Sequence, residues 1–366
     1  MIATSSVCPY FGELANAIVP QVCLTMPLID HSVTHPHLGL LAATDGMSKL
    51  SRAPSVIPVM WDRALVLSVT FISLCSGQQS SEVHNDGTFV FHSGLWINLH
   101  QFLIEQAMKT SVPPSGSQEW DAAVGYYRAE VVKLDPLGKE SARVSLLLSQ
   151  QKSPTALDST GLPVALAKVL NSAADLYRKR WWPVHDRANR GWVSQLTPQL
   201  EKYSDALKQR LLAVYATPWP SGPIRIDVVE YANSTGAYTT LDPIHTTVSS
   251  MAQANQGEAG LEIILHETSH ALIGKIRTAL SDEVRARNRL LTRHDFWHAI
   301  LFYTTGEIVR RSLDGYIPYA VRHGLYERSW PGVAEVLDAN WKLYLDGRID
   351  FETAIRRLVD AYSVPR

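Results

Sequence analysis

Cysteine is almost absent from this chain of 366 residues. Only Cys8, Cys23 and Cys75 occur, and none follows residue 75. A disulfide framework and a cysteine-ligated zinc site are therefore excluded from the rest of the sequence. An excess of either charge is lacking too, because 34 Lys and Arg residues face 35 Asp and Glu residues. Without a basic excess, we expect no nucleic-acid partner.

A membrane-spanning run is also missing. The apolar segment "ALVLSVTFISL", residues 64–74, is too short to cross a bilayer roughly 30 Å thick as a helix. It follows Arg63 and ends in small and polar residues, which is typical of a cleaved secretory signal. We therefore expect an exported protein, periplasmic or secreted, without a stable membrane span.

The position of this signal raises a question about the start of the protein. A secretory signal belongs at an N-terminus, so translation from Met47 or Met60 would make the preceding residues a spurious extension. Residues 1–77 then comprise this extension and the signal. The alternative is a disordered leader, with the apolar run as a core strand. "ISLC" also resembles a bacterial lipobox, although Leu74 departs from its usual Gly or Ala, so Cys75 is a candidate for a lipid anchor.

The next part of the chain has the spacing of helices. Apolar residues recur at i, i+3, i+4 and i+7 in four stretches. They are "LWINLHQFLIEQAM", "SQEWDAAVGYYRAEVVKL", "GLPVALAKVLNSAADLYRKRWW" and "VSQLTPQLEKYSDALKQRLLAVY". We expect a helical N-terminal domain over residues 78–220, closed by the breaker "TPWPSGP".

A second domain is predicted over residues 221–366. "IRIDVVEYA" and "HTTVSS" show the alternation and β-branched content of strands. The helical spacing then returns in "LEIILHETSHALIG", in "DFWHAILFYTTGEIVRRSL" and in a tail from "WPGVAEVLDANWKLYL" to "FETAIRRLVDAY". The predicted fold class is α+β and mostly helical, with a small sheet beside the HETSH helix.

The segment Leu261 to Gly274 carries the strongest chemical signal. On a helix, His266 and His270 lie about 40° apart on one face, with Glu267 at its edge. Two imidazoles at this spacing fix two corners of a tetrahedral zinc site. Because zinc lowers the pKa of bound water to about 7, a neighbouring carboxylate can take its proton. The competing interpretation is an amphipathic helix whose histidines have other partners.

A catalytic zinc site needs a third protein ligand, and two candidates lie on the next helix. Glu307 lies on the same face as Phe296, Ile300 and Tyr303, so its carboxylate projects from an apolar surface that a metal ion would compensate. The competing role of Glu307 is an ion pair with Arg310 or Arg311.

His298 is the rival third ligand. It lies nine residues before Glu307, about 180° around the helix, so both cannot face one metal ion. A packed core histidine is its alternative role.

These motifs resemble the gluzincin group of zinc metallopeptidases, in which HExxH and a glutamate on a later helix hold the metal. The resemblance covers roughly residues 221–315. It implies that His266, His270 and Glu307 bind zinc, that Glu267 is the general base, and that "HTTVSS" is the edge strand along which substrate lies. The setting of Glu307 departs from the thermolysin pattern, because Asn-Glu-x-x-Ser-Asp is absent. The extended metzincin motif is absent as well.

A zinc hydrolase often uses a further hydrogen-bond donor for the developing oxyanion. Tyr316, in "DGYIPY", is our candidate, because a loop after the ligand helix can fold back over the metal. Tyr303, Tyr319 and His323 lie near it in sequence. Plain packing is the alternative for each.

Two aromatic stretches could line a substrate cleft. They are "KRWWPVHDRANRGW", with three tryptophans, and "SGLWINLHQF", with Trp96, Asn98 and His100. In both we favour packing between helices over ligand binding.

The sequence as a whole predicts an exported zinc metallohydrolase that acts on a peptide or protein. The alternative is a non-catalytic envelope binding protein with the same fold and a structural metal, or none. A fourth protein ligand, such as His298 or His294, would favour that alternative, because structural zinc sites are closed.

Overall fold

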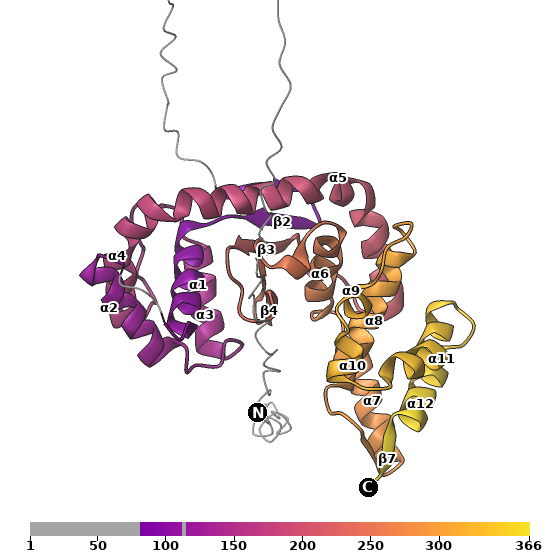
Figure 1. The fold of residues 1–366 in the computed structure, drawn as a ribbon. Helices are drawn as coiled ribbons and strands as arrows, with labels where there is room; N and C mark the ends of the chain where they lie inside the picture. Colours follow the sequence, from indigo (N-terminus) through magenta and orange to yellow (C-terminus); the bar gives the residue numbers. More distant parts are fainter. Residues whose placement is uncertain (1–80, 112–114) are drawn as a thin grey trace, which may run out of the picture. The chain divides into compact units, whose positions relative to one another are not determined.

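The computed structural model describes residues 81–111 and 115–366 (Figure 1). The predicted signal, the start sites Met47 and Met60 and the lipidation candidate Cys75 lie outside the described residues. The described residues belong to one compact unit, and the predicted domain boundary after residue 220 falls inside it. None of the described helices combines the length and the apolar character needed to span a membrane.

A five-stranded mixed sheet joins the two predicted domains. Its strands are β1 (Glu82–Asn85), β2 (Phe89–His92), β3 (Ile224–Val229), β4 (Ala237–Leu241) and β5 (Ile244–Ser249), in the order β1-β2-β3-β5-β4. Strands β2, β3 and β5 are parallel, whereas β1 and β4 pair antiparallel at the two edges. The sheet therefore needs strands from both sides of residue 220. The prediction of a helical domain over residues 78–220 did not include β2.

The two faces of the sheet differ in character. One face carries Ile226, Val228 and Val248, all fully buried. Helix α6 contacts the edge strand β4. The other face carries Asp227 and Thr247, which are opposite each other in the parallel register. Strands alternate their side chains between faces, so Val229 lies on the same face as Asp227, where it joins the apolar core of the helical part.

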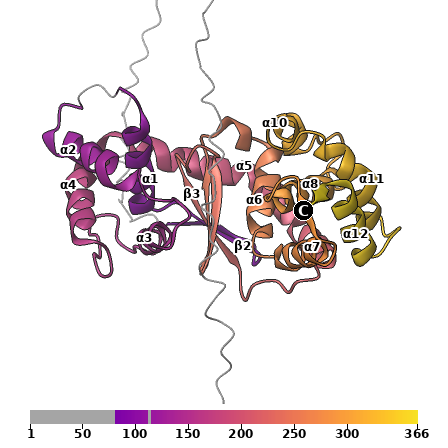
Figure 2. The same ribbon diagram turned by 90° about the horizontal axis from the view of Figure 1, so that it is seen from below.

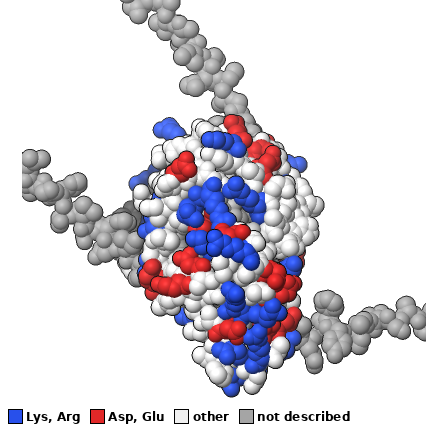
Figure 3. Space-filling view, turned by 90° about the vertical axis from the view of Figure 1, so that its right-hand side faces the viewer, with Lys and Arg blue, Asp and Glu red and all other residues white. Residues whose placement is uncertain are grey.

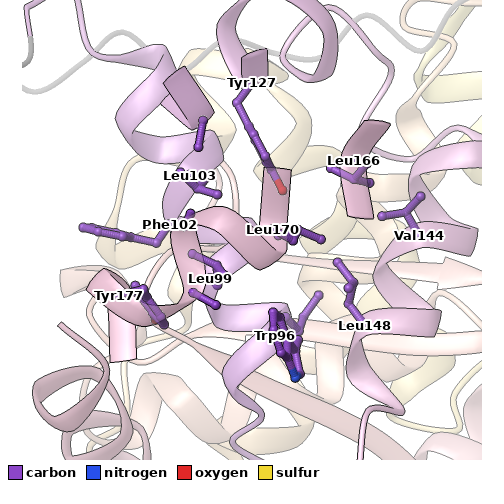
Figure 4. Close-up of a cluster of buried hydrophobic side chains, with 14 of the residues drawn as sticks. Trp96, Leu99, Phe102, Leu103, Tyr127, Val144, Leu148, Leu166, Leu170 and Tyr177 are labelled. Atoms are coloured by element: carbon purple, nitrogen blue, oxygen red, sulfur yellow. The ribbon is translucent and has the colours of Figure 1, made fainter. Parts of the chain in front are cut away.

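Helices α1 to α4 form the first part of the helical structure. They are α1 (Leu95–Met108), α2 (Gln118–Tyr126) with its π-helical extension (Tyr127–Val131), α3 (Lys139–Ser149) and α4 (Val164–Arg180). Their apolar faces meet in the core shown in Figure 4, where side chains such as Phe102, Leu170 and Tyr177 are fully or almost fully buried. The spacing of apolar residues predicted α1, α2 and α4 correctly, because each buries one stripe.

Helix α5 (Trp182–Tyr215) spans the described unit, as Figures 1 and 2 show. It contacts α1 and α4 at one end and α6 and α8 at the other. Pro198 lies inside this helix without ending it. The helix buries one side chain in each three or four positions, including Trp192, Leu196 and Leu200, and this packing offsets the hydrogen bond that the proline removes.

The remaining elements follow the sheet. They are a 3₁₀ turn (Gln253–Asn255), α6 (Glu258–Ser269), α7 (Gly274–Ala286), β6 (Arg289–Leu291), α8 (Phe296–Arg310), α9 (Tyr319–Arg322), α10 (Leu325–Ser329), α11 (Val333–Leu345), α12 (Phe351–Ala361) and β7 (Ser363–Pro365). Strands β6 and β7 form a small antiparallel pair. The predicted class, α+β and mostly helical, is confirmed.

Charges of both signs are interspersed on the face that Figure 3 shows. Ion pairs among the described residues include Arg287 with Asp360 at 2.5 Å and Arg311 with Asp346 at 2.6 Å. On this face, basic side chains lie beside acidic ones.

Candidate metal centre

Helix α6 presents the HETSH motif. It begins after Gly257, whose φ of 61° is in the left-handed region that favours glycine, and it ends at Ser269. The sequence predicted a helix that continues through His270. That residue instead caps the helix, but its φ of −57° and ψ of −32° are still helical. The one-turn relationship between His266 and His270 is therefore preserved, and their ring centres lie 5.1 Å apart.

Helix α8 brings a third imidazole to this pair. His266, His270 and His298 each offer a ring nitrogen, and these atoms lie within 4.8 Å of one another. The Nε2 atoms of His266 and His298 are 3.1 Å apart. We call these three residues the histidine group. His298 lies in the first turn of α8, where Phe296 and Ile300 are fully buried and fix the helix against its neighbours.

Aromatic rings enclose the histidine group. The ring of Phe302 stacks on that of His266 at 3.7 Å, and Trp330 meets His298 edge-on at 5.8 Å. On another side, Trp297 lies 5.8 Å from His270 and 5.1 Å from His298. These rings restrict the rotation of the imidazoles, which is the preorganisation that a metal site needs.

The three imidazoles are held in their neutral form. Burial lowers the pKa of His298 to about 4. Burial also lowers the pKa of His266 well below its usual value, and the charges of His270 and His298 act in the same direction. The pKa of His270 is lowered by burial, by His298 and by Arg277. A neutral imidazole keeps a free lone pair, and this is the form that binds a metal ion.

The hydrogen bonding of the group fits a cation. The two facing Nε2 atoms can share one proton or direct both lone pairs at a cation, and in either arrangement the buried Nδ1 of His266 has no partner in the described part of the chain. If both Nε2 atoms directed lone pairs at a cation, Nδ1 would carry the proton. The cation then compensates the facing lone pairs, so the residues fit a divalent metal ion.

Glu267 lies beside the group, on the side of the sheet. It is buried, and its Oε2 has no hydrogen-bond partner among the described residues. Burial raises the pKa of Glu267 to about 7, against the opposing effect of the nearby Thr239 hydroxyl. Thr239 belongs to β4, so residues of both β4 and α6 surround the Glu267 carboxylate.

The structure places Glu307 away from the histidine group. Its carboxylate accepts hydrogen bonds from Nε and Nη2 of Arg310, at 2.7 and 2.8 Å, and lies 3.7 Å from Nε of Arg311. Burial alone would raise the pKa of Glu307, but Arg310 and the neighbouring cations lower it. The structure therefore does not bring Glu307, the expected third ligand, to His266 and His270, and among the described residues His298 completes the group that could hold a metal ion. The expected 180° separation on α8 explains why only one of them can do so.

Tyr316 folds back onto α6, as a loop after α8 was expected to do, but it does not reach the histidine group by any contact we observe. Its hydroxyl donates to Oε2 of Glu262 at 2.7 Å, and the backbone N–H of Tyr319 donates to the same oxygen at 2.8 Å. Glu262 lies one helical turn before His266. Tyr316 is thus placed as an anchor of the loop rather than as an oxyanion donor.

The edge of the sheet beside α6 is β4 and not β5. The segment "HTTVSS" pairs with β3 on one side and with β4 on the other, so the expectation that it forms the edge is wrong. The edge strand "AYTTL", Ala237 to Leu241, was missed because it is short and its flanking turns lack an Asn-Gly or Asp-Gly signal. It contacts α6 directly.

The remaining candidates have mostly structural surroundings. The hydroxyl of Tyr303 donates to Asp338. The ring of Tyr319 lies 4.6 Å from His323 and 6.1 Å from Phe302, the ring that stacks on His266.

The two aromatic stretches pack as expected. Trp96, Asn98 and His100 are buried in α1, and Trp181 lies 4.3 Å from Trp120 in the core of the helical part.

Comparison with known proteins adds no assignment: no protein family, curated protein or solved structure matches this chain. The geometry of the site is therefore the basis for any functional proposal.

Proposed function

We propose that the protein is a metal-dependent hydrolase that uses zinc to cleave peptide bonds. One observation carries this proposal: three neutral histidines from two helices converge, with a buried carboxylate one residue after the first of them. The ligand set is three imidazoles, so the proposal does not depend on the glutamate ligand of gluzincins.

Three nitrogen ligands suit a catalytic zinc site. Such sites have three protein ligands and leave the fourth position for water or substrate, whereas structural sites are closed by four. Among the described residues the group has three members, and His294 is not one of them. Imidazoles also bind cobalt, nickel and copper. We propose zinc because zinc prefers tetrahedral coordination by such donors.

The chemistry follows from the positions of the residues. A zinc ion at the histidine group would lower the pKa of its bound water and polarise a carbonyl group. Glu267 lies beside His266 on α6 and has an unpartnered oxygen, so it is placed to accept a proton from the attacking water and pass it to the leaving amine. The aromatic rings around the group restrict access by bulk water, which strengthens such electrostatic effects.

Strand β4 favours a peptide as the substrate. It is an edge strand, so its outer backbone groups are not paired within the sheet, and an extended peptide can add to such an edge by main-chain hydrogen bonds. Because β4 contacts α6 and carries Thr239 near Glu267, a peptide on this edge would lie beside the proposed catalytic residues.

The test is the metal content of the purified full chain, measured by elemental mass spectrometry. We expect one zinc per chain in the wild type, loss of zinc in His298→Ala and retention in Glu307→Gln. In Glu267→Gln, zinc should remain while cleavage of a peptide library falls by about 10²-fold or more. A wild-type chain that neither carries zinc nor takes it up would overturn the proposal.

The alternative is a binding protein with a closed structural metal. This alternative would be favoured if the protein retained zinc and neither the wild type nor Glu267→Gln cleaved the peptides. The half-buried state of His270 and His298 speaks for an accessible metal.

A further inference from the structure

Arg277, in α7, is an unpaired cation close to the histidine group. Its guanidinium carbon lies 4.7 Å from the centre of the Trp297 ring. In the described part of the chain, the guanidinium of Arg277 has no carboxylate partner and donates no hydrogen bond. The acidic residues of the same helix are engaged elsewhere, because Asp282 pairs with Arg285 and Glu283 pairs with Arg287.

Trp297 links this cation to two of the proposed ligands. The same indole ring that carries Arg277 lies 5.8 Å from the ring of His270 and 5.1 Å from that of His298. Arg277, His270 and His298 therefore all contact the same indole ring. Stacking uses the flat face of a guanidinium and leaves the N–H donors at its edge available.

The histidine group is less deeply buried on the side of Trp297. His266, which does not contact Trp297, is buried. His270, His298 and Trp297 are only half-buried, and Arg277 is exposed. A molecule that approaches His270 and His298 from solvent on this side therefore meets the Trp297 and Arg277 side chains.

We propose that Arg277 is a specificity-determining residue that binds a carboxylate of the substrate while the reacting group is held at the histidine group. The substrate class is then a peptide with a carboxylate near the scissile bond. A planar guanidinium matches a carboxylate by two parallel hydrogen bonds, and no acid of the described chain competes for it. This inference rests on the proposed metal site.

The test uses zinc-loaded full-length protein and small hydroxamates, because the hydroxamate binds the metal and the rest of the molecule reports on the surroundings. Isothermal titration calorimetry compares butyrohydroxamate with the monohydroxamates of malonic, succinic and glutaric acid. We expect at least one of the three acids to bind about three- to tenfold more tightly than butyrohydroxamate, the gain of one exposed charge-assisted contact.

Variants of α7 identify the residue that is responsible. Arg277→Gln should abolish the preference for the acid without changing the affinity for butyrohydroxamate, and Arg277→Lys should retain part of it. The matched control is Arg285→Gln, which removes a paired arginine from the same helix and should leave the preference intact.

Three further probes distinguish the source of the carboxylate. They are succinyl hydroxamates coupled to glutamate amide, to alanine and to alanine amide. Preference for the first indicates an acidic side chain, and preference for the second indicates a free C-terminus. Equal affinity for all probes, or a preference that survives Arg277→Gln, would overturn the role of Arg277 and leave the metal site standing. A chain that binds neither zinc nor any hydroxamate would overturn both proposals.

Discussion

The Nε2 atoms of His266 and His298 lie 3.1 Å apart, although the two residues belong to different helices. Helix α6 supplies the first and α8 the second, and the two helices pack directly against each other. This contact converts a two-histidine motif into a group of three possible ligands.

Zinc should stabilise the protein through the histidine group. A ligand that binds only the folded state adds stability that grows with its concentration, about 2.7 kcal/mol at a hundredfold excess over Kd. We expect a rise in Tm on addition of zinc to metal-free wild type and to Glu307→Gln, but none for His298→Ala. Differential scanning fluorimetry over a zinc series measures this. An equal rise in His298→Ala would place the zinc elsewhere.

Gly306 should not tolerate a side chain. A Cβ atom at this position of α8 would lie 2.8 Å from Cβ of Pro318 and 3.2 Å from Oε1 of Glu262. Gly306→Ala should therefore destabilise the protein by about 1–3 kcal/mol, the usual cost of overpacking, despite the better helix propensity of alanine. Urea denaturation gives the value. Gly191→Ala is the matched control, because it lies in α5 with nothing within 4 Å, and it should be neutral or stabilising.

Glu262 should make stability depend on pH. Burial raises the pKa of this carboxyl to about 7, although the hydroxyl of Tyr316, the N–H of Tyr319 and the charge of Arg322 oppose the rise. Since the folded pKa exceeds the unfolded value, the folded state holds the proton longer. The free energy of unfolding should therefore fall as pH increases from about 4.5 to about 7.

The variant Glu262→Gln isolates this effect, because an amide has no proton to lose in that range. Its unfolding free energy should vary less with pH than that of the wild type, by a few kcal/mol at most. Chemical denaturation at pH 5 and pH 7.5 measures the difference. Identical pH profiles for the two proteins would contradict the assigned role of Glu262.

Asp227 should be essential for stability. It is fully buried in β3, and it accepts hydrogen bonds from His245 Nε2 at 2.7 Å and from Arg225 Nε at 2.7 Å. Burial alone would raise its pKa, but His245 and Arg225 lower it. Asp227→Ala leaves the buried Nε2 of His245 without a hydrogen-bond partner and Arg225 without its carboxylate, so we expect a loss of about 3–5 kcal/mol.

The control for this loss is an exposed ion pair. Asp175→Ala breaks the contact with Arg178 on the surface of α4 and should cost less than about 1 kcal/mol. Guanidinium denaturation of both variants gives the comparison. Similar losses in the two would show that burial of Asp227 is not the cause.

The helices could be predicted well from the sequence, and the sheet only in part. Apolar spacing located α1, α8, α11 and α12, since each buries a stripe that repeats every three or four residues. Strand β2 was missed, and so were the edge strands β1 and β4. Each edge strand has only four or five residues, and β2 pairs with β3, which is distant in sequence, so no local pattern shows these strands.

The sequence by itself determined that His266 and His270 lie on one helical face and that Glu307 and His298 exclude each other. Both results follow from the fixed rotation of a helix, which is a local property. Only the tertiary structure decided between the two rivals. Because α6 packs against α8, His298 in the first turn of α8 faces His266 in α6. Glu307 instead accepts a hydrogen bond from Arg310. The same is true of β4 and Arg277, because their positions near the site depend on contacts between elements far apart in the chain.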